Sequence, residues 1–313
     1  MARLNKSHRV SPYAAVLAPA VWGSTYLVAT QWLPPGAPMF DALLRALPAG
    51  IVLLLLTGGS LPRGGWLLRA FALGTLNIGL FFALLFVAAY RLPGGTAAMV
   101  IATQPLIVVL LSAVLLGIPI RLVHIGASVL GMVGVLLLLT RSRIHLDAIG
   151  IVAAAGAATS MAAGIVLTKK WGRPVPLLVF TAWQLLTGGL VLLIPTLLTE
   201  GVPAQITPVN LLGYLYLGLI GSCVAYAVWF RGIEQLSAAA VSFLGLVSPL
   251  VATALGYLYL HQGLTGWQIA GAACVLLAVL AGQLPPTATA AHARTSSGPA
   301  RAPNPSLQAT EEQ

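Results

Sequence analysis

The sequence consists mainly of apolar runs that are each as long as a helix must be to cross a lipid bilayer. A hydrocarbon core of about 30 Å is crossed by roughly 20 helical residues. By this measure we predict ten spans, at residues 11–30, 38–57, 68–89, 95–117, 121–140, 147–169, 175–198, 209–230, 237–259 and 264–284. Hydrophobic residues make up 58% of the chain and charged residues 7%, whereas about a quarter of a soluble protein is charged. The chain is therefore predicted to be an all-α polytopic membrane protein with ten transmembrane helices.

The ten predicted spans divide into two related sets of five. A polar residue followed by proline breaks a long apolar run at Gln104-Pro105, and the same pattern recurs 144 residues later at Ser248-Pro249. An offset of 139 residues relates the Leu-rich runs around Ala49-Gly50 to those around Gly188-Gly189. Because five is an odd number, the second set must enter the membrane in the opposite sense. We therefore predict two inverted five-helix repeats.

The first repeat is placed at residues 11–140 and the second at 147–284. The segment 285–313 is rich in Pro, Ala, Ser and Thr, so we expect a disordered tail. If residues 1–10 are cytoplasmic, the cationic residues on the cytoplasmic side are Arg3, Lys6, Arg9, Arg63, Arg69, Arg121, Lys169, Lys170, Arg173, Arg231, Arg294 and Arg301, and those outside are Arg91, Arg141 and Arg143. Cytoplasmic loops carry such an excess of Lys and Arg. Both termini are therefore predicted to be cytoplasmic.

Polar residues recur near the middle of several predicted spans. Counting depth at about 1.5 Å per residue places at one level Trp22, Ser24, Thr25, Asn77, Gln104, Pro105, Ser160, Ser222, Ser248 and Pro249. Inverted-repeat transporters bind their solutes at this level, between the repeats. The alternative is that each hydroxyl bonds to its own helix and each proline only kinks it. Side-chain amides are harder to satisfy locally, so Asn77 and Gln104 are the stronger candidates for the lining of a cavity.

The aromatic residues suggest one further part of such a cavity. Tryptophan is enriched at the membrane interfaces, and Trp229 and four others lie at predicted span ends. Trp22 is an exception, because it falls near the middle of its span. It either fills core volume or forms an aromatic wall together with Tyr26, which lies one turn further along.

Two charged residues fall within the second predicted span. Asp41 and Arg45 are four residues apart, so they share a helix face and can form an ion pair. Alternatively, Arg45 holds a carboxylate of the substrate with its two-pronged guanidinium. Asp41 is the only acidic residue that the sequence offers for proton coupling.

Several other kinds of protein are not favoured by the sequence. It contains no HExxH pair, no GxSxG motif and no paired intramembrane aspartates, so we predict no catalytic residue. Cys223 and Cys274 lie in apolar runs, and we predict no metal site, no cofactor and no disulfide. The net charge of +10 follows the loop positions, so no nucleic-acid partner is expected. Small residues in the fifth and tenth spans suggest close packing or a homodimer. A scaffold that binds no solute remains an alternative.

Four stretches resemble the EamA family of the drug/metabolite transporter superfamily: VWGSTYLVAT at 21–30, LLRALPAGIVLLLL at 43–56, GLFFALLFVAAYRLPGGTAAMVIATQPLIVVLLSAVLLG at 79–117 and AYAVWFRGIEQLSAAAVSFLGLVSPLVATALGYLYL at 225–260. The resemblance covers residues 12–284. It implies ten helices in two inverted EamA repeats, an inner-membrane location, and export of amino acids or related metabolites. The positions that match the family pattern are Trp22, Gly23, Ser24, Arg45, Pro105 and Pro249.

The chain departs from the family pattern at its acidic positions. Members commonly carry Gly-Glu at the ends of spans 4 and 9, where this chain has Gly117-Ile118 and His261-Gln262, and an acidic residue often stands where Ser248 stands here. The sequence thus predicts a secondary transporter that exports a small polar metabolite, such as an amino acid, by alternating access. The alternative is a permease for a nucleobase, a sugar or a drug-like metabolite.

Overall fold

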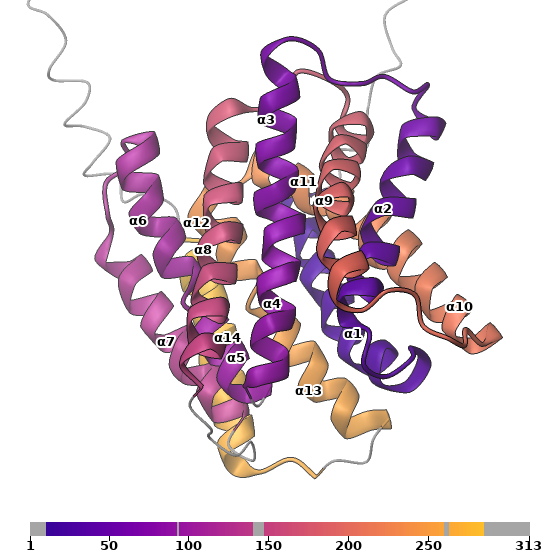
Figure 1. The fold of residues 1–313 in the computed structure, drawn as a ribbon. Coiled ribbons are helices and arrows are strands. Elements are labelled where there is room, and N and C mark those ends of the chain that lie inside the picture. Colours follow the sequence, from indigo (N-terminus) through magenta and orange to yellow (C-terminus); the bar gives the residue numbers. More distant parts are fainter. Residues whose placement is uncertain (1–10, 93, 140–146, 260–262, 285–313) are drawn as a thin grey trace, which may run out of the picture. The chain divides into compact units, whose positions relative to one another are not determined.

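The computed structural model describes residues 11–92, 94–139, 147–259 and 263–284. The predicted cytoplasmic N-terminus (1–10) and the predicted disordered tail (285–313) lie outside these residues. All regular structure in the described part of the chain is helical, and the helices shown in Figure 1 belong to one unit that ends at Gly282.

The helices follow one another as the apolar runs do. The first half contains the short helix η1 (Pro12–Val16), α1 (Leu17–Trp32), α2 (Pro38–Leu56), α3 (Gly65–Gly74), η2 (Thr75–Gly79), α4 (Leu80–Arg91), α5 (Gly94–Ile101), α6 (Gln104–Leu116) and α7 (Leu122–Leu138). The second half contains α8 (Ala148–Trp171), α9 (Leu177–Thr199), α10 (Pro208–Leu215), η3 (Tyr216–Val224), α11 (Ala225–Gln235), α12 (Ala238–Leu244), α13 (Val247–Tyr259) and α14 (Gly266–Gly282).

Length and composition identify seven candidate membrane spans among the described residues. These are Pro38–Leu56, Gly65–Ala88, Ala97–Leu116, Ala148–Trp171, Leu177–Thr199, Pro208–Gln235 and Ala238–Tyr259. The helices α7 and α14 are apolar but shorter, with 17 residues each, and α1 has 16. The expectation of a polytopic all-α membrane protein is therefore confirmed. Each of the ten predicted spans contains one helical segment, and the number of complete crossings stays a prediction.

The two helix breaks lie where the sequence placed them. The first separates α5 from α6 just before Gln104-Pro105, and the second separates α12 from α13 just before Ser248-Pro249. Proline lacks an N–H group and its ring clashes with the carbonyl one turn earlier. The chain crosses each break with tighter turns, through Thr103 N donating to Val100 O at 3.1 Å and Leu246 N donating to Phe243 O at 3.1 Å. Both breaks expose backbone groups inside the bundle.

A second irregularity was not anticipated from the sequence. The helices that correspond to the third and eighth predicted spans each contain a π-helical segment, η2 at Thr75–Gly79 and η3 at Tyr216–Val224. The repeat offset of 144 residues places η2 within η3. Such π-helical turns are rare and often occur at functional sites. Both halves of the chain thus carry the same rare distortion at matching positions.

Glycines allow two helix pairs to approach closely. A Cβ added to Gly134 of α7 would lie 2.8 Å from the carbonyl oxygen of Gly271 in α14, and one added to Gly271 would lie 2.6 Å from the carbonyl oxygen of Gly134. In Figure 1, α7 and α14 accordingly lie side by side. This part of the small-residue face is therefore used within one chain, and the homodimer stays a prediction.

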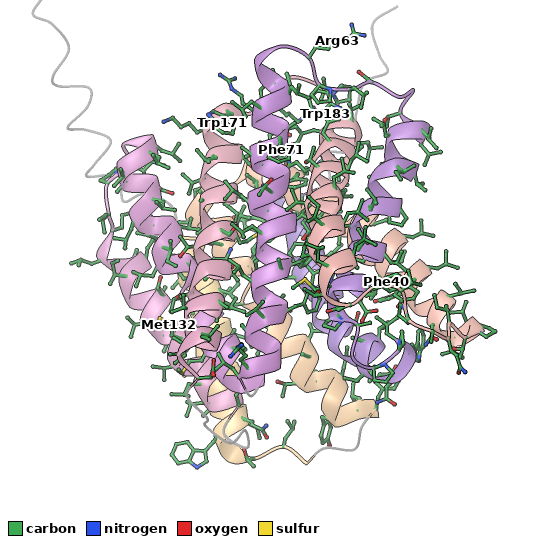
Figure 2. The ribbon with its side chains drawn as sticks, viewed as in Figure 1. Phe40, Arg63, Phe71, Met132, Trp171 and Trp183 are labelled. Carbon is green, nitrogen blue, oxygen red and sulfur yellow. The ribbon has the colours of Figure 1, made fainter. Side chains whose placement is uncertain are left out.

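Cationic residues gather at one end of the bundle. The Arg69 guanidinium lies over the rings of Trp66 and Trp171, with its Cζ 5.3 and 5.7 Å from their centroids. Arg173 forms an ion pair with Glu234 at 3.0 Å. Figure 2 shows Arg63 and Trp171 at this same end. The loops that were predicted to be cytoplasmic are thus neighbours in space.

Candidate functional site

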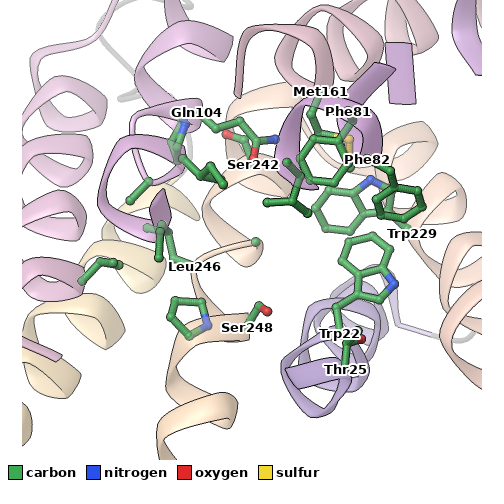
Figure 3. Close-up of a pocket in the computed structure, with 18 of the residues that line it drawn as sticks. Trp22, Thr25, Phe81, Phe82, Gln104, Met161, Trp229, Ser242, Leu246 and Ser248 are labelled. Carbon is green, nitrogen blue, oxygen red and sulfur yellow. The ribbon is translucent and has the colours of Figure 1, made fainter. Parts of the chain in front are cut away.

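A cavity of about 270 Å³ lies among helices from both halves of the chain. Its walls come from α1, α2, α4, α5, α6 and α7 in the first half and from α8, α11, α12 and α13 in the second. This volume lies near the lower end of the range for small-molecule sites, about 300 to 1,000 Å³. Figure 3 shows Gln104, Ser248 and Trp22 around it. Of the residues predicted at the site, those in the wall are Trp22, Thr25, Arg45, Gln104, Pro105, Ser248 and Pro249.

Both helix breaks face this cavity. Gln104 lines it from the first turn of α6, and Ser248 lines it from the first turn of α13. Neither side chain donates or accepts a hydrogen bond within the described part of the chain. Their polar groups are therefore available to a solute.

Arg45 is the only cationic residue among the described residues of the cavity wall, and it is almost fully buried, with 7% of its surface exposed. Its Nε donates to the hydroxyl of Ser222 at 3.4 Å, and its Nη2 donates to the carbonyl oxygen of Gly221 at 3.3 Å. Both acceptors belong to η3, where the π-helical turn disturbs the regular bonding of the helix. The guanidinium carbon also lies 4.7 Å from the centre of the Phe82 ring. Ser222 thus reaches the site through Arg45.

The ion pair between Asp41 and Arg45 is not formed. Among the described residues, the ion pairs join Arg91 to Asp147 and Arg173 to Glu234. Asp41 Oδ1 instead accepts a hydrogen bond of 2.8 Å from the hydroxyl of Tyr214 in α10. The pairing alternative was wrong because both side chains find partners across the bundle rather than along α2. Asp41 is not among the residues that line the cavity.

Trp22 lies in the aromatic wall. Its indole Nε1 donates to the carbonyl oxygen of Gly221 at 2.9 Å. Its ring centre lies 5.0 Å from that of Tyr226 and 5.2 Å from that of Trp229. One carbonyl of η3 therefore accepts from both Trp22 and Arg45.

The other predicted residues of α1 differ in their surroundings. Ser24 Oγ contacts the carbonyl oxygen of Val21 and the hydroxyl of Tyr216, each at 2.7 Å, so it bonds away from the cavity wall. Thr25 Oγ1 is buried at the wall and has no hydrogen-bond partner within the described part of the chain. The side chain of Tyr26 lies outside the described residues.

Asn77 and Ser160 lie at a second polar cluster rather than in the cavity wall. Asn77 Nδ2 donates to Gln184 Oε1 at 2.7 Å and to Thr168 Oγ1 at 3.2 Å, and Ser160 Oγ donates to the carbonyl oxygen of Leu76 at 2.8 Å. Asn77 is fully buried, and a Cβ on Gly164 would lie 2.6 Å from its Cγ. The amide was correctly identified as needing a partner, but that partner comes from another helix, with no space left for a solute.

Sequence reasoning missed most of the aromatic wall. Trp229 was assigned to the interfacial belt, yet it is 1% exposed and lines the cavity, because α11 continues to Gln235 instead of ending near Trp229. Phe81, Phe82 and Tyr226 also line the cavity. A single aromatic residue in an apolar run carries no signal of its own. Gln184 was also missed, although the offset of 139 residues relates it to Arg45.

No metal site is apparent in this part of the chain. Within residues 11–92, 94–139, 147–259 and 263–284, no three His, Cys, Asp or Glu side chains are close enough to hold an ion. The described residues of the cavity wall include no acidic side chain and no histidine. The site is therefore suited to holding a solute through one cation, a few uncharged polar groups and aromatic faces.

Comparison with known proteins identifies relatives over most of the chain. Protein PecM from Dickeya dadantii (strain 3937) is 52% identical over 268 residues, which is 85% of this chain and 90% of that protein. The uncharacterized inner membrane transporter YedA from Escherichia coli (strain K12) is 31% identical, over 75% of this chain and 78% of its own. A probable amino-acid metabolite efflux pump from Salmonella typhimurium is 26% identical, over 86% and 93%.

The fold is also shared with a protein of known crystal structure. That chain superposes with a TM-score of 0.74 at 20% identity, covering 91% of this chain and 98% of its own. The EamA-like transporter family matches twice, at residues 11–140 and 148–281. These names indicate a transporter rather than an enzyme, and the chain belongs to the EamA-like transporter family.

Proposed function

We propose that this protein is a secondary transporter of the inner membrane that exports amino acids or related small polar metabolites by alternating access. The observation that carries the proposal is the cavity itself, which lies at two helix breaks and is lined by both halves. Discontinuous helices form the solute site in many secondary transporters. The printed names of the relatives, an inner membrane transporter and an efflux pump among them, support location and direction.

An inverted repeat would allow this mechanism. The family matches each half separately, and η2 and η3 lie at corresponding places in the two halves. Each half contributes five predicted spans, so the halves would have opposite orientations and would rock against each other around the cavity. The cationic end around Arg69 and Arg173 would face the cytoplasm, and with it both termini.

Filling the cavity should stop transport without unfolding the protein. Ala98 of α5 lines the cavity, and tryptophan at this position would occupy much of its volume. We expect Ala98→Trp to lower saturable flux by more than about tenfold in proteoliposomes, because a solute that cannot enter cannot be carried. The matched control is Ala273→Trp on α14, where the alanine is exposed and does not line the cavity. Equal flux in the two variants would show that the solute travels elsewhere.

Asp41 is the candidate for proton coupling. Its carboxyl group is partly buried and bonded to Tyr214, and ionisable groups within spans often serve as proton relays. We expect Asp41→Asn to keep exchange of labelled for unlabelled solute but to lose the acceleration that a pH gradient produces. Glu234→Gln, at the cationic end, should keep it. A variant of Asp41 that still responds to the gradient would remove this residue from the coupling mechanism.

A second candidate function is a permease for a nucleobase, a sugar or a drug-like metabolite. The aromatic wall favours the planar members of this set over sugars, because rings such as Trp22 and Phe81 can stack on a flat solute. Competition by planar solutes for flux of a labelled amino acid would distinguish the two functions.

A further inference from the structure

We propose that the solute held in this cavity carries a net negative charge. It would be a small carboxylate with an apolar or aromatic body rather than a zwitterionic amino acid. The inference rests on the proposed transport function and narrows it to the anionic members of its substrate class.

The first argument is the balance of charge in the cavity. The Arg45 guanidinium is 93% buried by the exposed fraction of 7%, and no acidic side chain accompanies it among the described residues of the wall. The carboxyl group of Asp41, one turn away, is bonded to Tyr214. A cation within a membrane span is costly unless it is paired. An anionic solute would supply the missing charge, whereas a zwitterion would supply none in net terms.

The second argument is the part of the guanidinium that remains free. A guanidinium carries five N–H groups in one plane. The protein engages the edge formed by Nε and Nη2, through Ser222 and Gly221. The end formed by Nη1 and the second N–H of Nη2 has no acceptor within the described part of the chain. Two parallel N–H groups match the two oxygens of a carboxylate, so this end provides a fork for one.

The third argument is the absence of a place for an ammonium group. An amino acid bound by its carboxylate would bring its ammonium close to Arg45, where the two cations repel. Aromatic faces can hold cations, but the face of Phe82 is already covered by the Arg45 guanidinium. The remaining unpartnered group that is fully buried in the wall is the indole N–H of Trp229, which is a donor. Donors face acceptors, and a carboxylate or carbonyl oxygen is an acceptor.

The experiment compares three solutes that share one body and differ in charge. Phenylalanine is a zwitterion, N-acetylphenylalanine is an anion and phenylalaninamide is a cation near neutral pH. In proteoliposomes containing the full chain, we expect kcat/KM for N-acetylphenylalanine to exceed that for phenylalanine by at least about tenfold, since only the anion completes the charge-assisted pair. A membrane potential that is positive on the destination side should accelerate its flux.

Two substitutions test whether Arg45 causes this preference. Arg45→Gln should abolish the preference for the anion, and Arg45→Lys should restore part of it by returning the charge without the fork. Arg173→Gln is the matched control, because this cation pairs with Glu234 away from the cavity, and it should keep the preference. The melting temperature of each variant shows that the protein is folded.

The possible failures can be told apart. Saturable flux of phenylalanine that equals or exceeds that of the anion would overturn the inference and leave the transport function standing. A preference for the anion that survives in Arg45→Gln would also overturn it. Absence of flux for all three solutes in the folded, unmodified protein would overturn the proposed export of amino acids and related metabolites together with this inference.

Discussion

Replacing Gly50 with valine is expected to destabilise the protein by about 3 kcal/mol, the upper end of what overpacking usually costs. Gly50 lies where α2 crosses α9, and a Cβ there would be 2.8 Å from the Cα of Leu186. A Cβ on Gly189, on the facing helix, would be 2.7 Å from the Cα of Leu47. These obstacles are backbone atoms, which cannot turn aside as a side chain can. The two helices would have to separate.

The measurement is the free energy of unfolding in a titration with SDS, together with the melting temperature in detergent. Gly126→Val on α7 is the matched control, because a Cβ there would meet nothing within 4 Å. Valine is a slightly better helix former than glycine, so helix propensity alone would raise the stability of both variants. Equal stability of the two would contradict the close crossing of α2 and α9.

Breaking the contact between Asn77 and Gln184 is the second large effect. Both side chains are fully buried, and the amide of Asn77 donates to Gln184 at 2.7 Å. Leucine at either position would leave the other amide without this partner inside the bundle, which costs about 1 to 3 kcal/mol. We expect Asn77→Leu and Gln184→Leu each to destabilise the protein by about 2 kcal/mol on this basis.

The double variant distinguishes a direct contact from two independent effects. Leucine at both positions removes both amides at once, so it should cost less than the two single changes together, by about 1 kcal/mol for an interhelical hydrogen bond in a membrane protein. The control is Thr159→Val on α8, whose hydroxyl is exposed and bonds to its own helix at Ala155. Strict additivity of the two leucine substitutions would mean that the amides do not interact.

Local features of the sequence were enough to place the helices and their breaks. Pro105 and Pro249 interrupt their helices through a local clash, which depends on few neighbours, and the apolar runs correspond to the observed helical segments. The repeat was also visible, because it requires only comparison of the chain with itself. These features follow from the covalent chain and the bilayer thickness.

The partners of individual side chains could not be predicted in the same way. Asn77 and Gln184 are 107 residues apart, and Arg45 and Ser222 are 177 apart. Depth along a span gives the level of a residue but not the direction of its side chain. The π-helical segments change that direction part of the way along a span, so the amide of Asn77 was expected in the cavity wall and lies outside it. Repeat symmetry alone offered a link, from Arg45 to Gln184.

The π-helical segments also affect how the third span of each repeat can move. A π-helical turn holds one more residue than the α-helical turn it replaces, and the hydrogen bonds on either side remain α-helical. If the turn migrates by one residue, one bond changes from the π to the α pattern and its neighbour changes the other way, so the total number of bonds is unchanged. Side chains between the old and new positions rotate about the helix axis, while both ends of the helix stay fixed. Thr75–Gly79 and Tyr216–Val224 thus act as two built-in swivels, one in each repeat.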